Sequence, residues 1–284
     1  MLPLDLYDSI ESAWCPGCGN FPMLKAFKEA LAELEIRPEE MVVVSGIGQS
    51  SKFPHYLQCH TFNGIHGRTL PVATGFRLVN RDLKVMAVAG DGDCYGEGGN
   101  HLLAAFRRNP DITLFSHNNQ VYGLTKGQAS PTSDQGLKSP LHPQGVPYPP
   151  LHTLALAVAQ DCSWVARGFA GEGEHLKNLY KQALTHKGFS FLEVLQPCVS
   201  FNKINTYKWY QQRVYRVEET PDYDPDNELW AYQKAKEWGE RIPLGVIYRK
   251  VRPTLEEAYP GLAVKSLARP ESTPPISRLL ADFY

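Results

Sequence analysis

Short apolar segments recur along the chain and alternate with longer segments in which apolar residues follow a helical period. The segment 41–44 is Met-Val-Val-Val without a polar residue, which is typical of a strand buried on both faces of a sheet. Apolar positions three and four residues apart in 20–31 predict a helix with one buried face. The same patterns predict further strands at 83–89, 111–116, 164–169 and 190–195, and further helices at 70–79, 151–160, 175–186 and between the strands at 83–89 and 111–116.

This alternation predicts an α/β fold with a mostly parallel sheet flanked by helices. Residues 127–150 are rich in Pro, Gly, Ser and Gln, so we expect a long functional loop that covers a site or contacts another subunit. After Asn202 the chain becomes aromatic, charged and punctuated by proline, with one helix expected at 227–241. We therefore expect a domain at 1–202 and a C-terminal extension at 203–284 that packs on the core or on a partner subunit.

Composition favours a cytoplasmic protein. With 284 residues, 43% of them hydrophobic, the chain is large enough for one substantial core. The net charge of −1 and the lack of long Lys/Arg blocks give no reason to expect nucleic acid or a membrane surface as a partner. The N-terminus is acidic, unlike a signal peptide, and no apolar run is long enough to span a membrane.

Six cysteines in a reducing compartment favour metal binding over disulfides. Cys15 and Cys18 enclose Pro16 and Gly17, so a tight turn can aim both thiolates at one metal ion. From these residues alone, an iron-sulfur site, a zinc site and a redox dithiol all stay open. We expect Cys94 and Cys162 to be structural.

Two polar segments follow neighbouring predicted strands. Gly90, Asp91 and Gly92 come directly after the strand at 83–89, and Asn119 follows Asp91 by 28 positions, after the next strand. Open α/β sheets bind ligands at this edge, and glycines there let backbone amides approach an anion. Asp91 and Asn119 offer the oxygen ligands that Mg²⁺ prefers. The spacing therefore predicts a clamp for a metal ion and a diphosphate.

This arrangement resembles the thiamine diphosphate signature, in which GDG is followed 25 to 30 residues later by asparagine. The segment 121–132 further resembles the β subunits of 2-oxoacid:ferredoxin oxidoreductases. Other blocks that agree with this family, in order over roughly the first 210 residues, are WCPGCG (14–19), SGIG (45–48), FNGIHGR (62–68), GGNH (98–101) and PCVSFN (197–202). The resemblance implies the thiamine diphosphate-binding fold.

The resemblance implies that Asp91, Asn119 and the main-chain carbonyl of Val121 bind Mg²⁺ against the diphosphate. It also implies a cofactor pocket made from Ile47, Gly48, Ser50, Ser51, His66, Gly67, Gly90, Asp91, Gly92, Asp93, Asn119, Val121, Tyr122, Gly123, Leu124 and Thr125. Candidate catalytic or substrate-contacting residues are His66, Arg68, Lys52 and Lys126. An ordinary core or surface role remains the alternative for His66 and Arg68.

The resemblance also makes one 4Fe-4S cluster the favoured function of the cysteines. Cys198 lies in the block that resembles the family's last cluster ligand. Many relatives have cysteine directly after Gly-Ile-Gly, where this chain has Gln49, a poor ligand for iron. We expect Cys59 to supply the missing thiolate by a different loop path, so that Cys15, Cys18, Cys59 and Cys198 hold the cluster; a structural Cys59 is the alternative.

A member of this family is expected to decarboxylate a 2-oxoacid oxidatively, to form acyl-CoA from coenzyme A, and to pass electrons through the cluster to ferredoxin. The resemblance implies an α or fused αγ partner that supplies the glutamate activating the cofactor, and an (αβ)₂ assembly. Cations at Lys52, Arg68 and Lys126 favour 2-oxoglutarate over pyruvate, because a second substrate carboxylate would give them a purpose.

Two other functions stay open at this point. A thiamine-dependent decarboxylase or synthase without redox chemistry would share the clamp, but it would leave Cys15, Cys18 and Cys198 without a common purpose. A metal-binding scaffold subunit with a degenerate cofactor site would share the cysteines, but it would not need Asp91 and Asn119 at this spacing.

Overall fold

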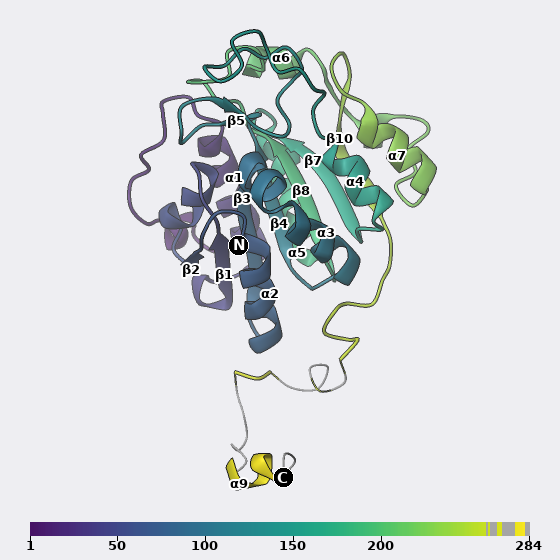
Figure 1. The fold of residues 1–284 in the computed structure, drawn as a ribbon. Helices are drawn as coiled ribbons and strands as arrows, with labels where there is room; N and C mark the ends of the chain where they lie inside the picture. The colour runs from purple at the N-terminus through teal and green to yellow at the C-terminus, as the bar shows by residue number, and fades with distance from the viewer. Residues whose placement is uncertain (260, 262–265, 269–275, 282–284) are drawn as a thin grey trace.

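The fold, seen in a computed structural model, is built on an eight-stranded sheet of order β2-β1-β3-β4-β8-β7-β10-β9 (Figure 1). All neighbouring strands run parallel except β7 and β10, which are antiparallel. The strands are β1 (Met41–Ser45), β2 (His60–Asn63), β3 (Lys84–Gly90), β4 (Thr113–Asn118), β7 (Trp164–Phe169), β8 (Ser190–Leu195), β9 (Val214–Arg216) and β10 (Ile242–Arg249), with a separate pair β5 (Val121–Tyr122) and β6 (Gln128–Ala129). The expected mostly parallel sheet is confirmed.

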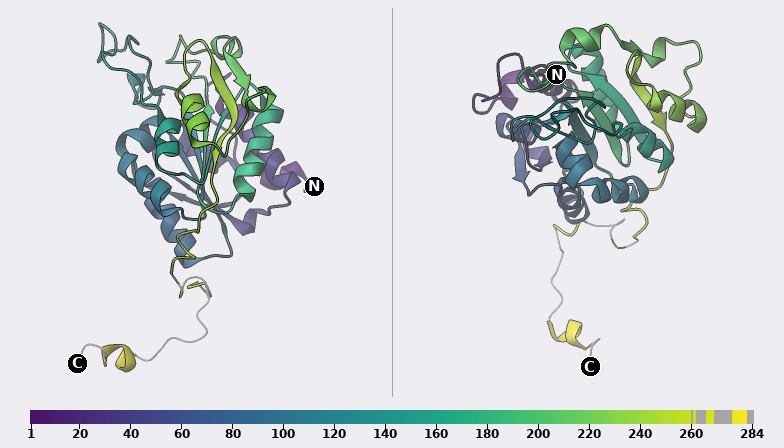
Figure 2. Two further views of the ribbon diagram at one scale, coloured as in Figure 1. Left: turned by 90° about the vertical axis from the view of Figure 1, so that its right-hand side faces the viewer. Right: turned by 45° about the horizontal axis from the view of Figure 1, so that its top comes forward.

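Helices cover both faces of this sheet (Figure 2). The α-helices are α1 (Asn20–Glu33), α2 (Thr69–Val79), α3 (Gly99–Arg108), α4 (Thr153–Ala159), α5 (Gly173–Thr185), α6 (Tyr207–Gln211), α7 (Glu228–Lys236) and α9 (Ile276–Leu280). Short helical turns are η1 (Leu4–Tyr7), η2 (Pro38–Glu40), η3 (Ser50–Tyr56), η4 (Gly92–Glu97) and η5 (Val217–Glu219). Helices α1 and α5 pack on one face, and α2, α3, α4 and α7 pack on the other.

Side chains of β1 point alternately to the two faces of the sheet, which explains why residues 41–44 are all apolar. Val42 and Val44 contribute to the core beneath α2 and α3, whereas Val43 contributes to the core beneath α1 and α5. Because both faces are covered, all five residues of the strand are buried, and all of them except the last, Ser45, are apolar. Every predicted strand and helix that lies in the first 200 residues is present, with ends shifted by at most a few residues.

The structure describes residues 1–259, 261, 266–268 and 276–281, so part of the expected extension at 203–284 lies outside the described residues. The described part adds β9 and β10 to the main sheet, which the sequence had not predicted. The helix expected at 227–241 ends at Lys236, because Glu237 is extended and Gly239 has a positive φ of 88°. Among the helices that are described, each is too short or too polar to cross a lipid bilayer.

Strands β1, β3, β4 and β8 all point the same way, so the loops that follow them gather at one edge of the sheet, at the top of Figure 1. The right-hand view of Figure 2 brings this edge forward. Segments that are distant in sequence, 46–49, 90–93 and 118–123, meet there. The fold therefore places the polar segments singled out above side by side.

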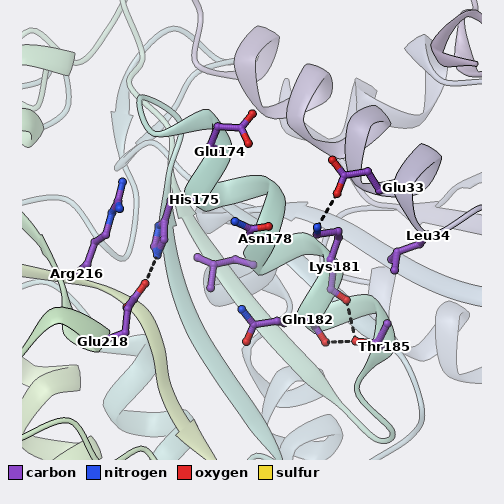
Figure 3. Close-up of a pocket in the computed structure, with 11 residues that line it drawn as sticks. Glu33, Leu34, Glu174, His175, Asn178, Lys181, Gln182, Thr185, Arg216 and Glu218 are labelled. Atoms are coloured by element: carbon purple, nitrogen blue, oxygen red, sulfur yellow. Dashed lines mark hydrogen bonds and ion pairs between the residues drawn. The ribbon is translucent and has the colours of Figure 1, made fainter. Parts of the chain in front are cut away.

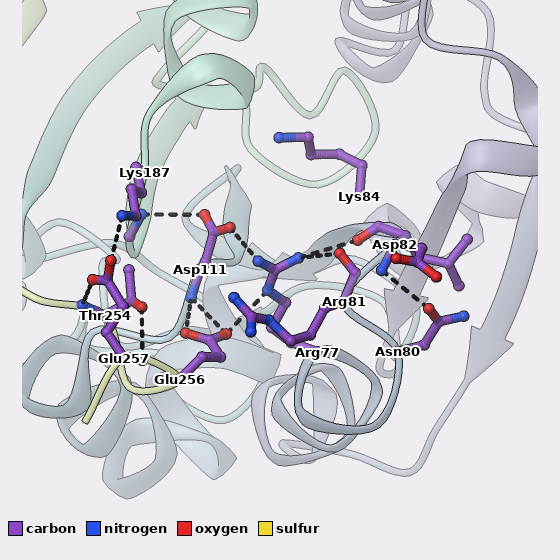
Figure 4. Close-up of polar contacts among 12 residues, drawn as sticks. Arg77, Asn80, Arg81, Asp82, Lys84, Asp111, Lys187, Thr254, Glu256 and Glu257 are labelled. Atoms are coloured by element: carbon purple, nitrogen blue, oxygen red, sulfur yellow. Dashed lines mark hydrogen bonds and ion pairs between the residues drawn. The ribbon is translucent and has the colours of Figure 1, made fainter. Parts of the chain in front are cut away.

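The opposite edge is closed by a network of charged residues that fastens the segment 253–257 (Figure 4). The carboxylate of Glu256 is 1% exposed and accepts from Nε of Arg77 at 3.0 Å and from the backbone N of Asp111 at 3.2 Å. Nη2 of Arg77 lies 2.7 Å from Oδ2 of Asp111. The backbone N of Leu255 donates to the carbonyl of Asn109 at 3.0 Å. This network ties the C-terminal segment to the start of β4.

We predict that Glu256→Ala lowers the free energy of unfolding by about 3 kcal/mol, because the mostly buried Arg77 loses one of its two carboxylate partners and the backbone N of Asp111 loses its acceptor. The control is Asp226→Ala, which breaks an exposed pair with Arg249 and should cost less than about 1 kcal/mol. Urea denaturation of both variants measures the difference. Equal losses would show that the Glu256 network does not stabilise the fold.

Candidate functional site

A pocket lies at the carboxyl ends of β1, β3 and β4, where the clamp was expected. Its lining residues are Ile47, Gly48, Gln49, Ser50, His66, Gly90, Asp91, Gly92, Asp93, Asn119, Val121, Tyr122, Gly123, Leu124 and Thr125. Of the sixteen residues expected to form a cofactor pocket, only Ser51 and Gly67 are not in this lining. Gln49 is an addition that the sequence argument had considered only as a poor iron ligand.

Asp91 stands at the point where β3 ends and the turn η4 begins. Its side chain is nearly inaccessible to solvent, and Oδ2 accepts a hydrogen bond from the hydroxyl of Thr132 at 2.9 Å. Burial raises the pKa of this carboxyl to about 6, although the hydroxyls of Ser130 and Thr132 oppose the shift. A buried carboxylate facing a pocket is costly without a cation beside it, so this position suits a metal ion.

Asp93 has a different role, because its carboxylate is saturated by groups of the protein. Oδ1 accepts from the backbone N of Gly67 at 2.8 Å and from that of Ile47 at 3.1 Å, while Oδ2 accepts from the hydroxyl of Thr69 at 3.2 Å. Burial raises the pKa of Asp93 in spite of these donors. Asp93 therefore joins the loops after β1 and β2 to the turn η4. Ring atom Nδ1 of His66 lies 3.2 Å from Asp93 Oδ1.

The second half of the clamp is a sharp turn between β4 and β5. Oδ1 of Asn119 accepts from the backbone N of Val121 at 3.0 Å, and Gln120 between them has a positive φ of 61°. The Gln120 side chain is fully buried: Nε2 donates to the carbonyl of Thr132 at 2.9 Å, and Oε1 accepts from the hydroxyl of Tyr210 at 2.8 Å. Gln120 thus holds the turn that presents the expected metal ligands, and the sequence had given no sign of it.

Glycine is required at two positions of the pocket by close approach rather than by backbone angle. A Cβ at Gly92 would stand 2.3 Å from the Tyr122 ring, and a Cβ at Gly90 would stand 2.8 Å from the hydroxyl of Ser50. The Tyr122 hydroxyl in turn donates to Oε2 of Glu97 at 3.3 Å. The two glycines therefore let Tyr122 and Ser50 close in on the loop that follows β3.

The cationic residues expected to contact substrate, Lys52, Arg68 and Lys126, lie outside the lining of the pocket. Lys52 is half-buried on η3, and Lys126 is exposed with a positive φ of 76°. Arg68 is exposed, and its guanidinium contacts the ring of His101. Of the four expected catalytic residues, His66 alone belongs to the described lining of the pocket.

Three of the four expected cluster cysteines come together beside this pocket. The turn carrying Cys15 and Cys18 rests on the segment after β8, since the backbone N of Gly19 donates to the carbonyl of Pro197 at 3.2 Å. Ser200 Oγ donates to Cys15 Sγ at 3.2 Å. Burial raises the pKa of the Cys18 thiol to about 11, and the nearby thiols of Cys198 and Cys15 raise it further. Among the described residues, no three His, Cys, Asp or Glu side chains are already arranged around one ion position.

The structure does not bring Cys59 to the other three. Cys59 directly precedes β2, and the next residue, His60, pairs with Val42 near the start of β1. Cys198 instead follows the end of β8, so the two cysteines lie at opposite edges of the parallel strands. Burial raises the pKa of Cys59 to about 12, and its hydrogen-bonding neighbour is the backbone of Val43. The turn η3 carries the chain back along the sheet before β2 begins, which the sequence argument had not foreseen.

A separate groove lies between α1 and α5, and it contains none of the expected site residues (Figure 3). Its charges are matched within the protein: Glu33 pairs with Lys177 at 2.9 Å and with Lys181 at 2.5 Å, while Nε2 of His175 lies 2.8 Å from Glu218. This groove therefore offers no free charge of the kind that the pocket around Asp91 presents.

Comparisons with known proteins agree with this geometry. Residues 44–194 match the model of the thiamine pyrophosphate enzyme C-terminal TPP binding domain, and residues 198–264 match that of the C-terminal region of the pyruvate ferredoxin oxidoreductase β chain. The chain is 44% identical to 2-oxoacid:ferredoxin oxidoreductase 1, subunit beta, of Aeropyrum pernix, over 94% of this chain and 87% of that protein. It is 42% identical to 2-oxoglutarate oxidoreductase subunit KorB of Mycobacterium tuberculosis, over 70% of this chain and 53% of that one.

A solved structure is also similar throughout its length. It is described as 2-oxoglutarate:ferredoxin oxidoreductase from Magnetococcus marinus with 2-oxoglutarate, coenzyme A and succinyl-CoA bound. The TM-score is 0.87 at 33% sequence identity, covering 95% of this chain and 97% of that chain. The similarity therefore includes the β9 and β10 region as well as the strands that carry the pocket.

We predict that Gly46→Ala destabilises the protein by about 1 to 3 kcal/mol, because the new Cβ would stand 2.1 Å from an Asp93 carboxylate that three donors hold in place. Gly99→Ala is the control: nothing lies within 4 Å of a Cβ there, and alanine suits the first turn of α3. Urea denaturation compares the two variants. A Gly46→Ala protein as stable as the control would mean that Asp93 is free to move.

Proposed function

This chain belongs to the β subunits of 2-oxoacid:ferredoxin oxidoreductases, and on that premise we propose that its pocket binds thiamine diphosphate through Mg²⁺. The proposed reaction is the oxidative decarboxylation of a 2-oxoacid to an acyl-CoA and carbon dioxide, with electrons passed to ferredoxin. The observation that carries the proposal is the buried Asp91 carboxyl, which faces the same pocket as the Asn119 turn.

The residues of the pocket suit this cofactor. Asp91 would supply a carboxylate oxygen, and Asn119 and Val121 would supply an amide and a main-chain carbonyl, which are the hard oxygen ligands of Mg²⁺. The cation would compensate the buried negative charge that otherwise raises the Asp91 pKa. Gly90 and Gly92 let Ser50 and Tyr122 pack against the loop, and both glycines line the pocket in which the diphosphate would bind.

When bound, thiamine diphosphate supplies the electron sink that a decarboxylation requires. The chain's own contribution is to orient the cofactor and to keep charge and protons in place around it. His66 can hold a proton at the pocket, since its Nδ1 lies 3.2 Å from both Asp93 Oδ1 and Glu97 Oε2. The described lining of the pocket contains no glutamate, which supports an activating glutamate supplied by an α or fused αγ subunit in an (αβ)₂ assembly.

We propose that the cysteines beside the pocket bind an iron-sulfur cluster that takes up the electrons. Cys15, Cys18 and Cys198 converge where the turn at 15–19 rests on the segment after β8. All six cysteines are free thiols, so none is withheld from a metal site by a disulfide. The fourth thiolate that the sequence led us to expect from Cys59 is not part of this proposal, because Cys59 lies at the other edge of the sheet. In this scheme residues 1–202 carry the cofactor sites, and the described part of the region after residue 202 supports them.

For the substrate we propose 2-oxoglutarate over pyruvate. Two similar proteins, from Mycobacterium tuberculosis and Magnetococcus marinus, are named for 2-oxoglutarate. The structure of the latter also holds coenzyme A and succinyl-CoA, which supports coenzyme A as the acyl acceptor here. Arg68 is exposed two residues after His66 of the lining, and we propose it as the cation that meets a second carboxylate entering from the solvent side.

We predict that Asp91→Ala abolishes measurable thiamine diphosphate binding, because the variant loses the charged ligand of the proposed Mg²⁺ ion. Isothermal titration of the assembled complex with thiamine diphosphate and Mg²⁺ measures this. Asp161→Ala is the control, since Asp161 is half-exposed and pairs with Lys250 away from the pocket. Unchanged affinity in Asp91→Ala would overturn the proposed clamp.

A second prediction concerns the cluster. Cys198→Ser should lose most of the iron and sulfide of the anaerobically purified complex, whereas Cys59→Ser should keep them, because Cys59 lies at the opposite sheet edge. Cys162→Ser, in the core, serves as the control. Metal and sulfide content with the visible spectrum distinguish the outcomes. Equal losses in the first two variants would make Cys59 a ligand, and zinc in place of iron would contradict the redox proposal.

The third prediction is a kcat/KM for 2-oxoglutarate at least about 10-fold above that for pyruvate in the reconstituted complex. Arg68→Ala should reduce the value for 2-oxoglutarate by about 10-fold and leave that for pyruvate nearly unchanged, since hydrogen bonds to charged groups contribute roughly 1.5 to 3 kcal/mol. Steady-state kinetics with both substrates tests this. A higher kcat/KM for pyruvate would reverse the proposed preference.

A further inference from the structure

A third buried carboxylate stands behind the pocket and was not expected from the sequence. Glu193, in the middle of β8, is 1% exposed. Its Oε1 accepts from the hydroxyls of Thr153 at 2.6 Å and Tyr95 at 3.1 Å, and its Oε2 accepts from Nε of Arg167 at 2.9 Å. A carboxylate so placed in a central strand is rare unless it is paired, and here both oxygens have partners.

A chain of hydrogen bonds leads from this carboxylate to the proposed metal ligand. Nδ2 of Asn118 donates to Glu193 Oε1 at 3.2 Å, which leaves Asn118 Oδ1 pointing towards Thr132. The Thr132 hydroxyl lies 2.8 Å from that Oδ1 and 2.9 Å from Oδ2 of Asp91. Each side chain along this path, from Glu193 to Asp91, is at most 4% exposed. Glu193, together with the backbone N of Gln120, which donates to Asn118 Oδ1 at 3.2 Å, determines which way the Asn118 amide faces. Asn118 Oδ1 then competes with Asp91 Oδ2 for the single proton of the Thr132 hydroxyl, so the amide sets how firmly Thr132 binds Asp91.

The charge of Glu193 is balanced on its far side. Arg167 on β7 pairs with it, and the Arg167 guanidinium lies over the ring of Trp238 at 5.5 Å. Because Arg167 neutralises Glu193 locally, Asn118 and Thr132 present dipoles to Asp91 rather than a second unbalanced negative charge. The Asp91 carboxylate then has Oδ2 engaged by Thr132 and can offer its other oxygen to a cation in the pocket.

We propose that Glu193 is a positioning residue for the Mg²⁺ clamp, acting through Asn118 and Thr132 on Asp91. The proposal rests on the function proposed above, because it concerns the same metal site. Partners that orient a metal ligand change metal affinity by about 10 to 100-fold when removed. A buried ion pair that only stabilised the fold would leave the metal affinity of the folded protein unchanged, and this difference makes the proposal testable.

The sharpest variants are Thr132→Val, which removes the hydroxyl at constant shape, and Thr132→Ser, which keeps it. Thr113→Val is the matched control, because Thr113 is equally buried on β4 but donates to the carbonyl of Ala183 and has no link to Asp91. Glu193→Gln tests the start of the chain. The Mg²⁺ concentration for half-maximal thiamine diphosphate binding is measured on the assembled complex by fluorescence titration, alongside urea denaturation of each variant.

We expect Thr132→Val and Glu193→Gln to raise this Mg²⁺ concentration by about 10-fold or more, with Thr132→Ser and Thr113→Val close to the unaltered protein. Saturating Mg²⁺ should restore the turnover of Thr132→Val, since the defect lies in metal binding. Unaltered Mg²⁺ affinity in Thr132→Val would overturn the proposal, as would an equal loss in Thr113→Val. Failure of the unaltered complex to bind the cofactor with Mg²⁺ would overturn the proposed function as well, so the two failures are distinguishable.

Discussion

The burial of carboxylates at the carboxyl edge of a parallel sheet is the constraint on which the rest of the site depends. Asp91, Asp93 and Glu193 are each at most 3% exposed, and a buried charge is tolerated only when it is paired or well hydrogen-bonded. Asp93 is satisfied by backbone amides and a hydroxyl, and Glu193 by an arginine. Asp91 accepts from the Thr132 hydroxyl, yet its pKa is still raised to about 6, so it retains capacity for a cation.

The position of the Asn119 turn relative to Asp91 depends on residues that come after residue 202. Asp134 accepts from the side chains of Gln120, Asn205 and Trp238, which links the Asn119 turn to the region beyond residue 202. Tyr210 donates to Gln120 from the same region. The strands β9 and β10 extend the sheet and so fix where these aromatic residues stand. The described part of the region beyond residue 202 thereby helps to hold the Asn119 turn in place.

Elements and site residues that a short sequence pattern marks could be predicted. Residues whose role depends on where distant parts of the chain lie could not. The strands β1, β3, β7 and β8 are buried on both faces, so their sequences are mostly apolar, with Arg167 and Glu193 as a buried exception. All four residues of β2 are exposed, and β10 contains Pro243 and a bulge near Val246, so neither has a strand-like pattern. The pocket lining followed from glycines and acids at strand ends. Gln120 and Glu193 act only through partners distant in sequence, and no local pattern marks such residues.

The mouth of the pocket indicates why a subunit of this family works within an assembly. Leu124, which lines the pocket, is 45% exposed, and Ile65, which directly precedes His66 of the lining, is 72% exposed. Apolar side chains gathered at the rim of a charged pocket favour coverage by another protein surface, because water there would weaken every electrostatic contact to the cofactor. A partner seated on this rim would exclude water and bring in the glutamate that the described lining lacks. The same surface that completes the site would then also hold the subunits together.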